Sequence, residues 1–176
     1  MRFTSALFFL ATLATSCLAG VPEIEDDIAS IGTSLNTLHT SILAFPTTGG
    51  TLAQALAIHN NAVNLGTELN QGITDVNTTP RPISDEDCAT FLASLEALEP
   101  IIDDTLIQIG NRKAAFQALP IGGLPALVKQ DLNNLCTATE AFANALLNLC
   151  PSDEATALRD RILAACNAAR AIYADV

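Results

Sequence analysis

Large apolar side chains recur every three or four residues along almost the whole chain after residue 20. This spacing is typical of α-helices that each bury one face. Stripes of this kind cover residues 24–42, 52–76, 91–119, 128–149 and 158–172. No segment shows the sustained alternation of apolar and polar residues that favours a strand. The pattern therefore predicts an all-α fold, a single five-helix bundle.

Proline and short polar residues mark where the expected helices begin, end or change direction. Thr51, Ser84 and Ser152 stand where a side-chain oxygen can cap a helix N-terminus. Pro151 separates the last two helices, so these should form an antiparallel hairpin. Pro100 lies inside the third helix, where it removes a backbone donor and crowds the carbonyl four residues back. We therefore expect the third helix to be kinked at Pro100.

The helical register restricts how the cysteines can pair. Cys136 and Cys150 lie fourteen residues apart on one helix, which places them about 21 Å apart, too far for a disulfide. Cys166 lies about as far from Cys150 along the second helix of the hairpin. Two disulfides, Cys136–Cys166 and Cys88–Cys150, satisfy the geometry, and four buried free thiols are the alternative.

The N-terminus has the features of a secretory signal peptide. A basic residue precedes an apolar run over residues 3–13, and small residues follow, so we expect cleavage after Ala19. Residues 1–19 would then be a signal peptide and residues 20–176 the helical-bundle domain. Cleavage would remove Cys17 and leave an even number of cysteines. Cys17 as the acylated residue of a bacterial lipoprotein is a poorer alternative.

Charge and hydropathy exclude several kinds of partner. The chain has 19 acidic and 8 basic residues and a formal net charge of -11. This excess of negative charge disfavours binding to nucleic acid or to anionic membranes. Beyond the signal peptide no apolar run is long enough to be a transmembrane segment. We expect a secreted protein, extracellular or in the cell wall.

Motifs for catalysis or for cofactors are missing from the sequence. It has no serine elbow, phosphate-binding loop or dinucleotide fingerprint, so we expect no enzyme and no cofactor. His59 falls among apolar positions of the second helix, where a hydrogen-bonded structural role is the main alternative to a ligand-binding one. Neither His59 nor His39 has partners at metal-ligand spacing, so no metal site is expected.

Asn77 begins an N-glycosylation sequon in an expected loop, and an unmodified asparagine is the alternative.

The chain resembles the fungal hydrophobic surface-binding protein A family, which is related to lipid-binding domains of cell-wall mannoproteins. The resemblance covers most of residues 20–173. It is carried by the helix from Asp27-Ile28 to Phe45-Pro46, by Gly50-Thr51-Leu52 leading into Ala55-Leu56, and by the order of five helices. Plant invertase and pectin methylesterase inhibitors are also secreted four-cysteine bundles. Their cysteine pattern begins in an N-terminal hairpin, whereas this chain has no cysteine between Cys17 and Cys88.

The resemblance implies a secreted, non-enzymatic protein that binds hydrophobic surfaces or long-chain lipids such as fatty acids. Alternative functions are an adaptor that recruits a secreted esterase, a structural cell-wall protein and an inhibitor. Alanines line one face of the last helix, and such small residues either bring helices close together or leave a void. If a cavity exists, we expect it beside the kink at Pro100, and a filled core is the other interpretation. The candidate ligand-binding residues are Leu56, His59, Val63, Leu98, Ile102, Leu106, Leu135, Phe142 and Ile162, with His59 meeting a carboxylate.

Overall fold

The structure, a computed structural model, describes residues 20–120 and 122–176. These residues form six α-helices and no strand, which confirms the all-α class. The helices are α1 (Val21–Ala44), α2 (Leu52–Thr78), α3 (Asp85–Asn111), α4 (Lys113–Gln117), α5 (Leu124–Leu149) and α6 (Asp153–Ile172). The predicted count of five was wrong because the chain turns at Arg112. The short α4 then places Ala115 and Phe116 against the same core, so the apolar pattern does not show the break.

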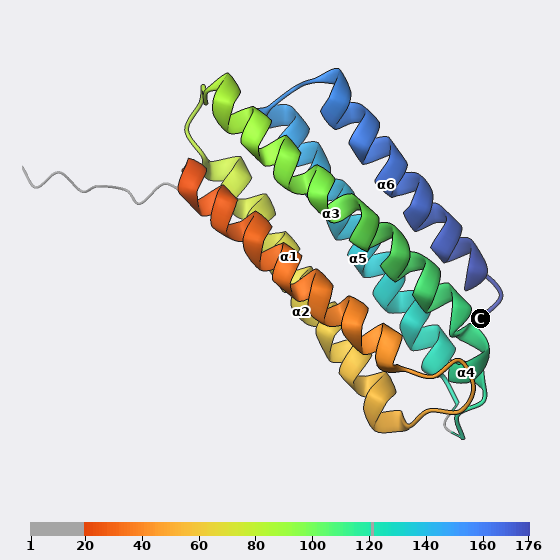
Figure 1. Cartoon of the computed structure of the whole chain (residues 1–176). Coiled ribbons are helices and arrows are strands. Elements are labelled where there is room, and N and C mark those ends of the chain that lie inside the picture. The colour runs from red at the N-terminus through yellow and green to blue at the C-terminus, as the bar shows by residue number, and fades with distance from the viewer. Residues whose placement is uncertain (1–19, 121) are drawn as a thin grey trace, which may run out of the picture.

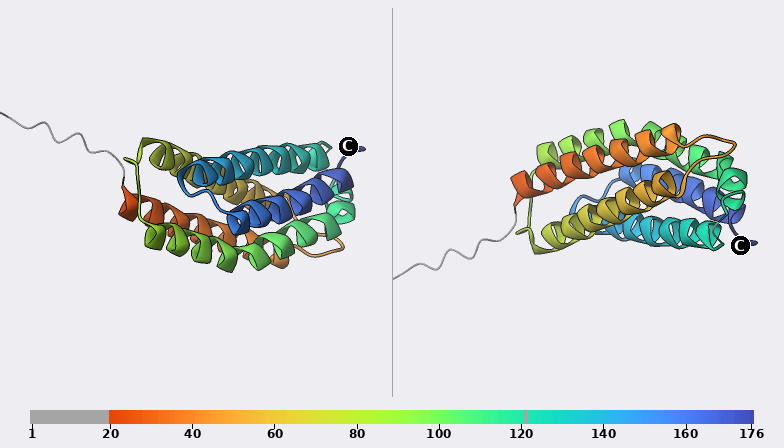
Figure 2. Two further views of the ribbon diagram at one scale, coloured as in Figure 1. Left: turned by 90° about the horizontal axis from the view of Figure 1, so that it is seen from above. Right: turned by 90° about the horizontal axis from the view of Figure 1, so that it is seen from below.

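The five long helices lie side by side and form a closed ring, with successive long helices running in opposite directions (Figure 1). α1 packs on α2 and α3, α2 packs also on α5, and α6 lies between α3 and α5. Seen from above and from below, the bundle has the same neighbouring helices (Figure 2). α4 lies across one end of the ring. Because each long helix contacts two neighbours, every apolar stripe faces the axis of the bundle.

The expected caps are present at the starts of three helices. Thr51 Oγ1 accepts a hydrogen bond from the Gln54 backbone N–H at 3.2 Å. Ser84 caps α3 by accepting from the Asp87 N–H at 3.1 Å, and Ser152 caps α6 in the same way. These bonds satisfy N–H groups that the first helical turn leaves free.

The expected kink at Pro100 is not shown: α3 is helical from Asp85 to Asn111, with Pro100 inside it. Pro100 and Glu96 are both exposed, so the proline lies on the solvent side of the helix. The Glu96 carbonyl that loses its usual donor faces water, which can bond to it. Packing on α1 and α6 supports the opposite side of α3.

Both predicted disulfides are confirmed. Cys88 of α3 is bonded to Cys150 at the end of α5, and Cys136 of α5 is bonded to Cys166 of α6, with Cα separations of 5.5 and 5.8 Å. Two disulfides fit a protein of an oxidising, extracytoplasmic compartment. The first bond links α3 to α5, and the second links α5 to α6.

Several sequence features lie elsewhere than expected or beyond the structure. Asn77 is exposed but belongs to the last turn of α2 and not to a loop, and its glycosylation stays a prediction. The predicted signal peptide, residues 1–19, lies outside the described residues. Within the described ranges, no helix combines the length and hydropathy needed to cross a membrane.

Candidate functional site

The ring of five long helices encloses a cavity of about 560 Å³. A ring of this kind has no helix on its axis, so side chains from opposite walls must fill the centre. Here they fill it incompletely. The lining is mostly aliphatic and comes from all five long helices, and it includes both disulfides.

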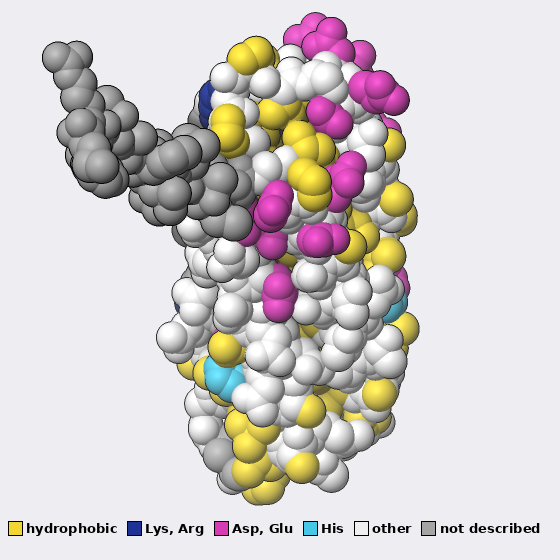
Figure 3. All heavy atoms as spheres, turned by 90° about the vertical axis from the view of Figure 1, so that its left-hand side faces the viewer, with side chains coloured by type: hydrophobic (Ala, Val, Ile, Leu, Met, Phe, Trp, Pro, Cys, Tyr) yellow, Lys and Arg dark blue, Asp and Glu magenta, His cyan; other side chains and the backbone are white. Residues whose placement is uncertain are grey.

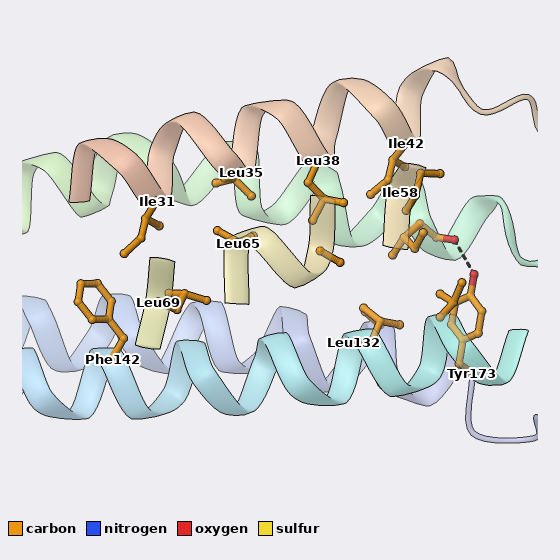
Figure 4. Packing of buried hydrophobic residues seen from close by; sticks show 14 of the residues in the cluster. Ile31, Leu35, Leu38, Ile42, Ile58, Leu65, Leu69, Leu132, Phe142 and Tyr173 are labelled. Carbon is orange, nitrogen blue, oxygen red and sulfur yellow. Dashed lines mark hydrogen bonds between the residues drawn. The ribbon is translucent and has the colours of Figure 1, made fainter. Parts of the chain in front are cut away.

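The wall formed by α1 and α2 comes from regular helical stripes. α1 contributes Ile31, Leu35, Leu38 and Ile42, and α2 contributes Ile58, Ala62, Leu65 and Leu69. In Figure 4 the α1 side chains point across the interior toward Leu132 and Phe142 of α5. The spacing of three and four residues keeps each set on one helical face.

The wall formed by α6 is built from smaller side chains. Ala155 and Cys166 line the cavity together with Leu158 and Ile162. The sequence left open whether the alanines of this helix draw it close to its neighbours or leave a void. The structure has a cavity beside this wall, since short side chains fill less of the space inside the ring.

At one end of the bundle, outside the cavity lining, aromatic residues and an arginine are buried. The rings of Phe45 and Phe116 stack with centroids 4.4 Å apart. The Arg112 guanidinium is buried beside them, and it donates from Nε to the Phe45 carbonyl at 2.7 Å and from Nη2 to the Leu43 carbonyl at 3.2 Å. These bonds satisfy carbonyls at the C-terminus of α1. The Tyr173 hydroxyl donates to the Ile109 carbonyl at 2.9 Å and ties the end of α6 to α3 (Figure 4).

The opposite end of the cavity is polar. Asp85 at the start of α3 and Ser152, Glu154 and Arg159 at the start of α6 all line the cavity there. Arg159 is the one Lys or Arg in the cavity lining of the described residues. Its Nε and Nη2 donate to Asp160 at 2.9 and 2.7 Å, and its side chain keeps partial exposure to solvent. This end therefore combines polar surroundings with one basic residue and the carboxylates of Asp85 and Glu154.

A second polar group, Asp131, lies in the cavity wall away from that end. His59 Nδ1 lies 2.9 Å from one oxygen of this carboxylate and 3.1 Å from the other. The pKa of Asp131 is raised above its usual value, because the effect of burial exceeds the opposing effect of the hydrogen bond with His59. On α1, His39 makes a comparable pair with Asp104 at 3.3 Å. In the described part of the chain, no three His, Cys, Asp or Glu side chains are grouped so as to hold a metal ion.

The predicted ligand-binding residues divide into two groups. Leu98, Ile102, Leu106, Leu135, Phe142 and Ile162 line the cavity. Leu56, His59 and Val63 do not, and Leu56 and Val63 are exposed on the outer side of α2. The face chosen for α2 was one residue out of register. The prediction placed the larger Leu56 and Val63 toward the interior, whereas the packing buries the smaller Ala55 and Ala62.

The sequence interpretation missed Arg159 and Asp131 as cavity residues. Arg159 follows Leu158 and precedes Ile162 by three residues, so it lies on the apolar side of α6 where a basic residue is unusual. On α5, Asp131 lies directly before Leu132, a buried residue of the apolar stripe. A charged residue at the edge of an apolar stripe was the signal that could have identified both.

Comparison with known proteins identifies the fold and the family. The model of the family hydrophobic surface binding protein A matches residues 21–148. The crystal structure of AFMP4P in complex with palmitic acid superposes with a TM-score of 0.79 at 27% identity and covers 87% of this chain and 99% of that one. No curated protein sequence matches the chain.

Two ligand-binding domains of the Penicillium marneffei MP1 protein share the fold. Domain 1, complexed with arachidonic acids, has a TM-score of 0.77 at 18% identity, with 87% of this chain and 97% of that one covered. Domain 2, complexed with multiple arachidonic acids, has a TM-score of 0.73 at 16% identity, with 89% and 97% covered. The family match, which spans most of the chain, shows that this protein belongs to the hydrophobic surface binding protein A family.

Proposed function

We propose that this protein binds a long-chain fatty acid in the cavity enclosed by its five long helices. The observation that carries the proposal is the cavity of about 560 Å³ with a mostly aliphatic lining. Ligand pockets in proteins usually measure roughly 300–1,000 Å³. Each methylene group transferred from water into such a lining contributes about 0.8 kcal/mol, so a long acyl chain would bind favourably.

The comparisons support this ligand class. AFMP4P, which is 27% identical and has the same fold, holds palmitic acid, and the two MP1 domains hold arachidonic acids. The proposed role is binding and not catalysis. Recruitment of a secreted esterase and a structural role in the cell wall stay predictions of the family resemblance, because no described residue favours either.

The charges of the lining favour one orientation of the ligand. A fatty acid carboxylate needs a positive partner or access to water. Arg159 is the basic residue of the lining and is partly exposed to water, and it shares this end with its partner Asp160 and with Asp85 and Glu154. At the opposite end of the bundle Phe45 and Phe116 are buried, and the Arg112 guanidinium is bonded to carbonyls inside the protein. The carboxylate of Asp131 lies farther along the wall and would repel a second negative group. We infer that the carboxylate lies beside Arg159 and that the acyl chain extends toward Ile42 and Val128.

A calorimetric titration of the delipidated protein with palmitate tests this proposal. We expect saturable binding, and a flat titration would contradict the cavity function. Arg159→Gln should weaken binding on the order of tenfold, because it removes a charge-assisted hydrogen bond. Arg161→Gln is the matched control on the same helix, since Arg161 pairs with Glu99 outside the cavity lining. Equal losses in the two variants would refute the orientation while leaving the cavity intact.

A further inference from the structure

Charged residues are absent from one continuous part of this strongly acidic protein. Residues 28–67 contain no Asp, Glu, Lys or Arg, although the chain has 19 acidic and 8 basic residues. This stretch forms most of α1, the α1–α2 connection and more than half of α2. In Figure 3 the acidic side chains gather toward one end of the molecule. The other end, where α1 meets α2, shows hydrophobic and uncharged polar side chains.

The same stretch exposes large aliphatic side chains. Leu43, Leu52, Leu56 and Val63 are between 36% and 51% exposed. Leu52, Leu56 and Val63 are spaced by four and seven residues, so they share one face of α2. The core takes a different face of this helix, which includes Ile58, Leu65 and Leu69. Leu43 lies four residues after His39, which contacts Thr105 of α3, so Leu43 belongs to the α3 side of α1. Leu52, Leu56 and Val63, together with the residues between them on the outer side of α2, are called the uncharged face below.

A surface of this composition is suited to contact with a medium of low dielectric constant. Charged groups near such a medium lose hydration and are costly, whereas aliphatic groups gain from leaving water. Between Leu52 and Val63 the polar side chains are those of Gln54, His59, Asn60 and Asn61, and His59 is hydrogen-bonded to Asp131 of α5. The acids at the start of α1 and near the end of α2, including Glu23, Asp26 and Asp75, would remain in water when the uncharged face is in contact.

We propose that the uncharged face is the surface by which this protein adsorbs to an apolar–water interface, such as an oil droplet or a hydrophobic solid. This site goes beyond the proposed cavity function, because none of Leu52, Leu56 and Val63 lines the cavity. The folded bundle can therefore hold a ligand inside and rest on an apolar surface at the same time. Adsorption needs no opening of the helices.

Adsorption isotherms of the full-length secreted protein on octadecyl-silica particles test the proposal. The double variant Leu56→Lys/Val63→Lys places two charges on the uncharged face. The matched control Ile107→Lys/Ile172→Lys makes the same change at the exposed aliphatic residues of α3 and α6. Lysine is a good helix former, so both variants should fold, which circular dichroism checks. Palmitate titration in solution reports on the cavity separately.

We expect the first variant to need a roughly tenfold higher concentration for half coverage, while the control stays close to wild type. Palmitate binding should be unchanged in both. Equal adsorption losses, or a loss in the control alone, would overturn the proposal. So would a first variant that loses only self-association, measured by sedimentation, because the face would then be a contact between two copies.

Hydroxyl-radical labelling of the unmodified protein gives an answer that does not depend on the variants. On the particles, labelling of Leu56 and Val63 should fall relative to the protein in solution. Labelling of Ile107 and Ile172 should persist. The reverse pattern would place the adsorbing surface on the α3–α6 side of the bundle and overturn the assignment.

Discussion

Ile102 and Ile24 are the same residue type in one bundle, yet their surroundings differ. Ile102 of α3 lines the cavity and is partly buried, whereas Ile24 of α1 is fully buried in closely packed core. Space beside a side chain decides how a larger one is tolerated. The two positions therefore form a matched pair for testing whether the cavity is open in solution.

We expect Ile102→Phe to change the free energy of unfolding only slightly, because the ring can enter the cavity. Palmitate affinity should fall, since the ring takes space from the acyl chain. Ile24→Phe should cost roughly 1–3 kcal/mol through overpacking and leave palmitate affinity unchanged. Urea denaturation and calorimetric titration measure both effects. A strongly destabilised Ile102→Phe that still binds palmitate would rule out this site.

Asp27 is a buried carboxyl on α1 with unfavourable surroundings. It is 9% exposed, and its Oδ2 has no hydrogen-bond partner among the described residues. Burial, followed by the negative charge of Asp75 and then that of Glu68, raises the pKa of Asp27 from 3.8 to about 6. The folded protein therefore holds this proton more tightly than the unfolded chain. Stability from this group is full below about pH 4 and is lost as the pH rises to about 6.

Asp27→Asn should consequently stabilise the protein at pH 7 by about 1–3 kcal/mol, and the gain should largely disappear at pH 4. The amide has a similar shape and carries no charge to bury. Denaturation curves at the two pH values measure the difference. Asp26→Asn is the control, because Asp26 is exposed and should give a much smaller gain. A gain independent of pH would show that charge burial is not its cause.

At the scale of the helices, the disulfides divide the ring into two parts. Both involve α5, so α3, α5 and α6 are covalently linked, whereas α1 and α2 are held by packing and hydrogen bonds. The linked helices carry the polar end of the cavity with Arg159. α2 carries the uncharged face. The two proposed binding surfaces thus belong to different parts of the ring.

Removing either disulfide should lower the free energy of unfolding by roughly 3.5–4.5 kcal/mol in the chain-entropy model. The Cys88–Cys150 bond closes a separation of 62 residues and the Cys136–Cys166 bond one of 30. The first should therefore contribute slightly more, because a longer loop loses more entropy on closure. Denaturation of the variants Cys88→Ala/Cys150→Ala and Cys136→Ala/Cys166→Ala measures both. A larger loss from the shorter loop would show that packing around the bond dominates its contribution.

For the whole molecule, the two ends of the bundle differ in structure and in charge. The end with Phe45, Phe116 and Tyr173 is closed around the buried Arg112, and the uncharged face begins beside it. The other end carries the polar opening of the cavity and the first turns of α3 and α6, with their acidic residues. An interface held at the uncharged end would leave the polar opening in water. The proposed lipid cavity and the proposed adsorbing surface are therefore compatible in one orientation.

The sequence by itself determined the elements and their covalent links. Helical periodicity, the caps at Thr51, Ser84 and Ser152, and the turn at Pro151 are local signals that depend on a few neighbouring residues, and the structure confirms them. The disulfide pairing followed because helix length alone excluded the alternatives. Six of the candidate cavity residues also lie in the cavity wall, since their helical stripes were correctly assigned.

Tertiary structure decided the rest. The buried face of α2 depends on which side meets α1 and α5, so its alanines were passed over in favour of Leu56 and Val63. Pro100 does not end α3, which continues to Asn111, and its place on the solvent side follows from the packing of α3 on α1 and α6. The cavity exists because five helices close into a ring without filling its axis. Closure of that ring, and hence the volume inside it, is a property of all the helices together.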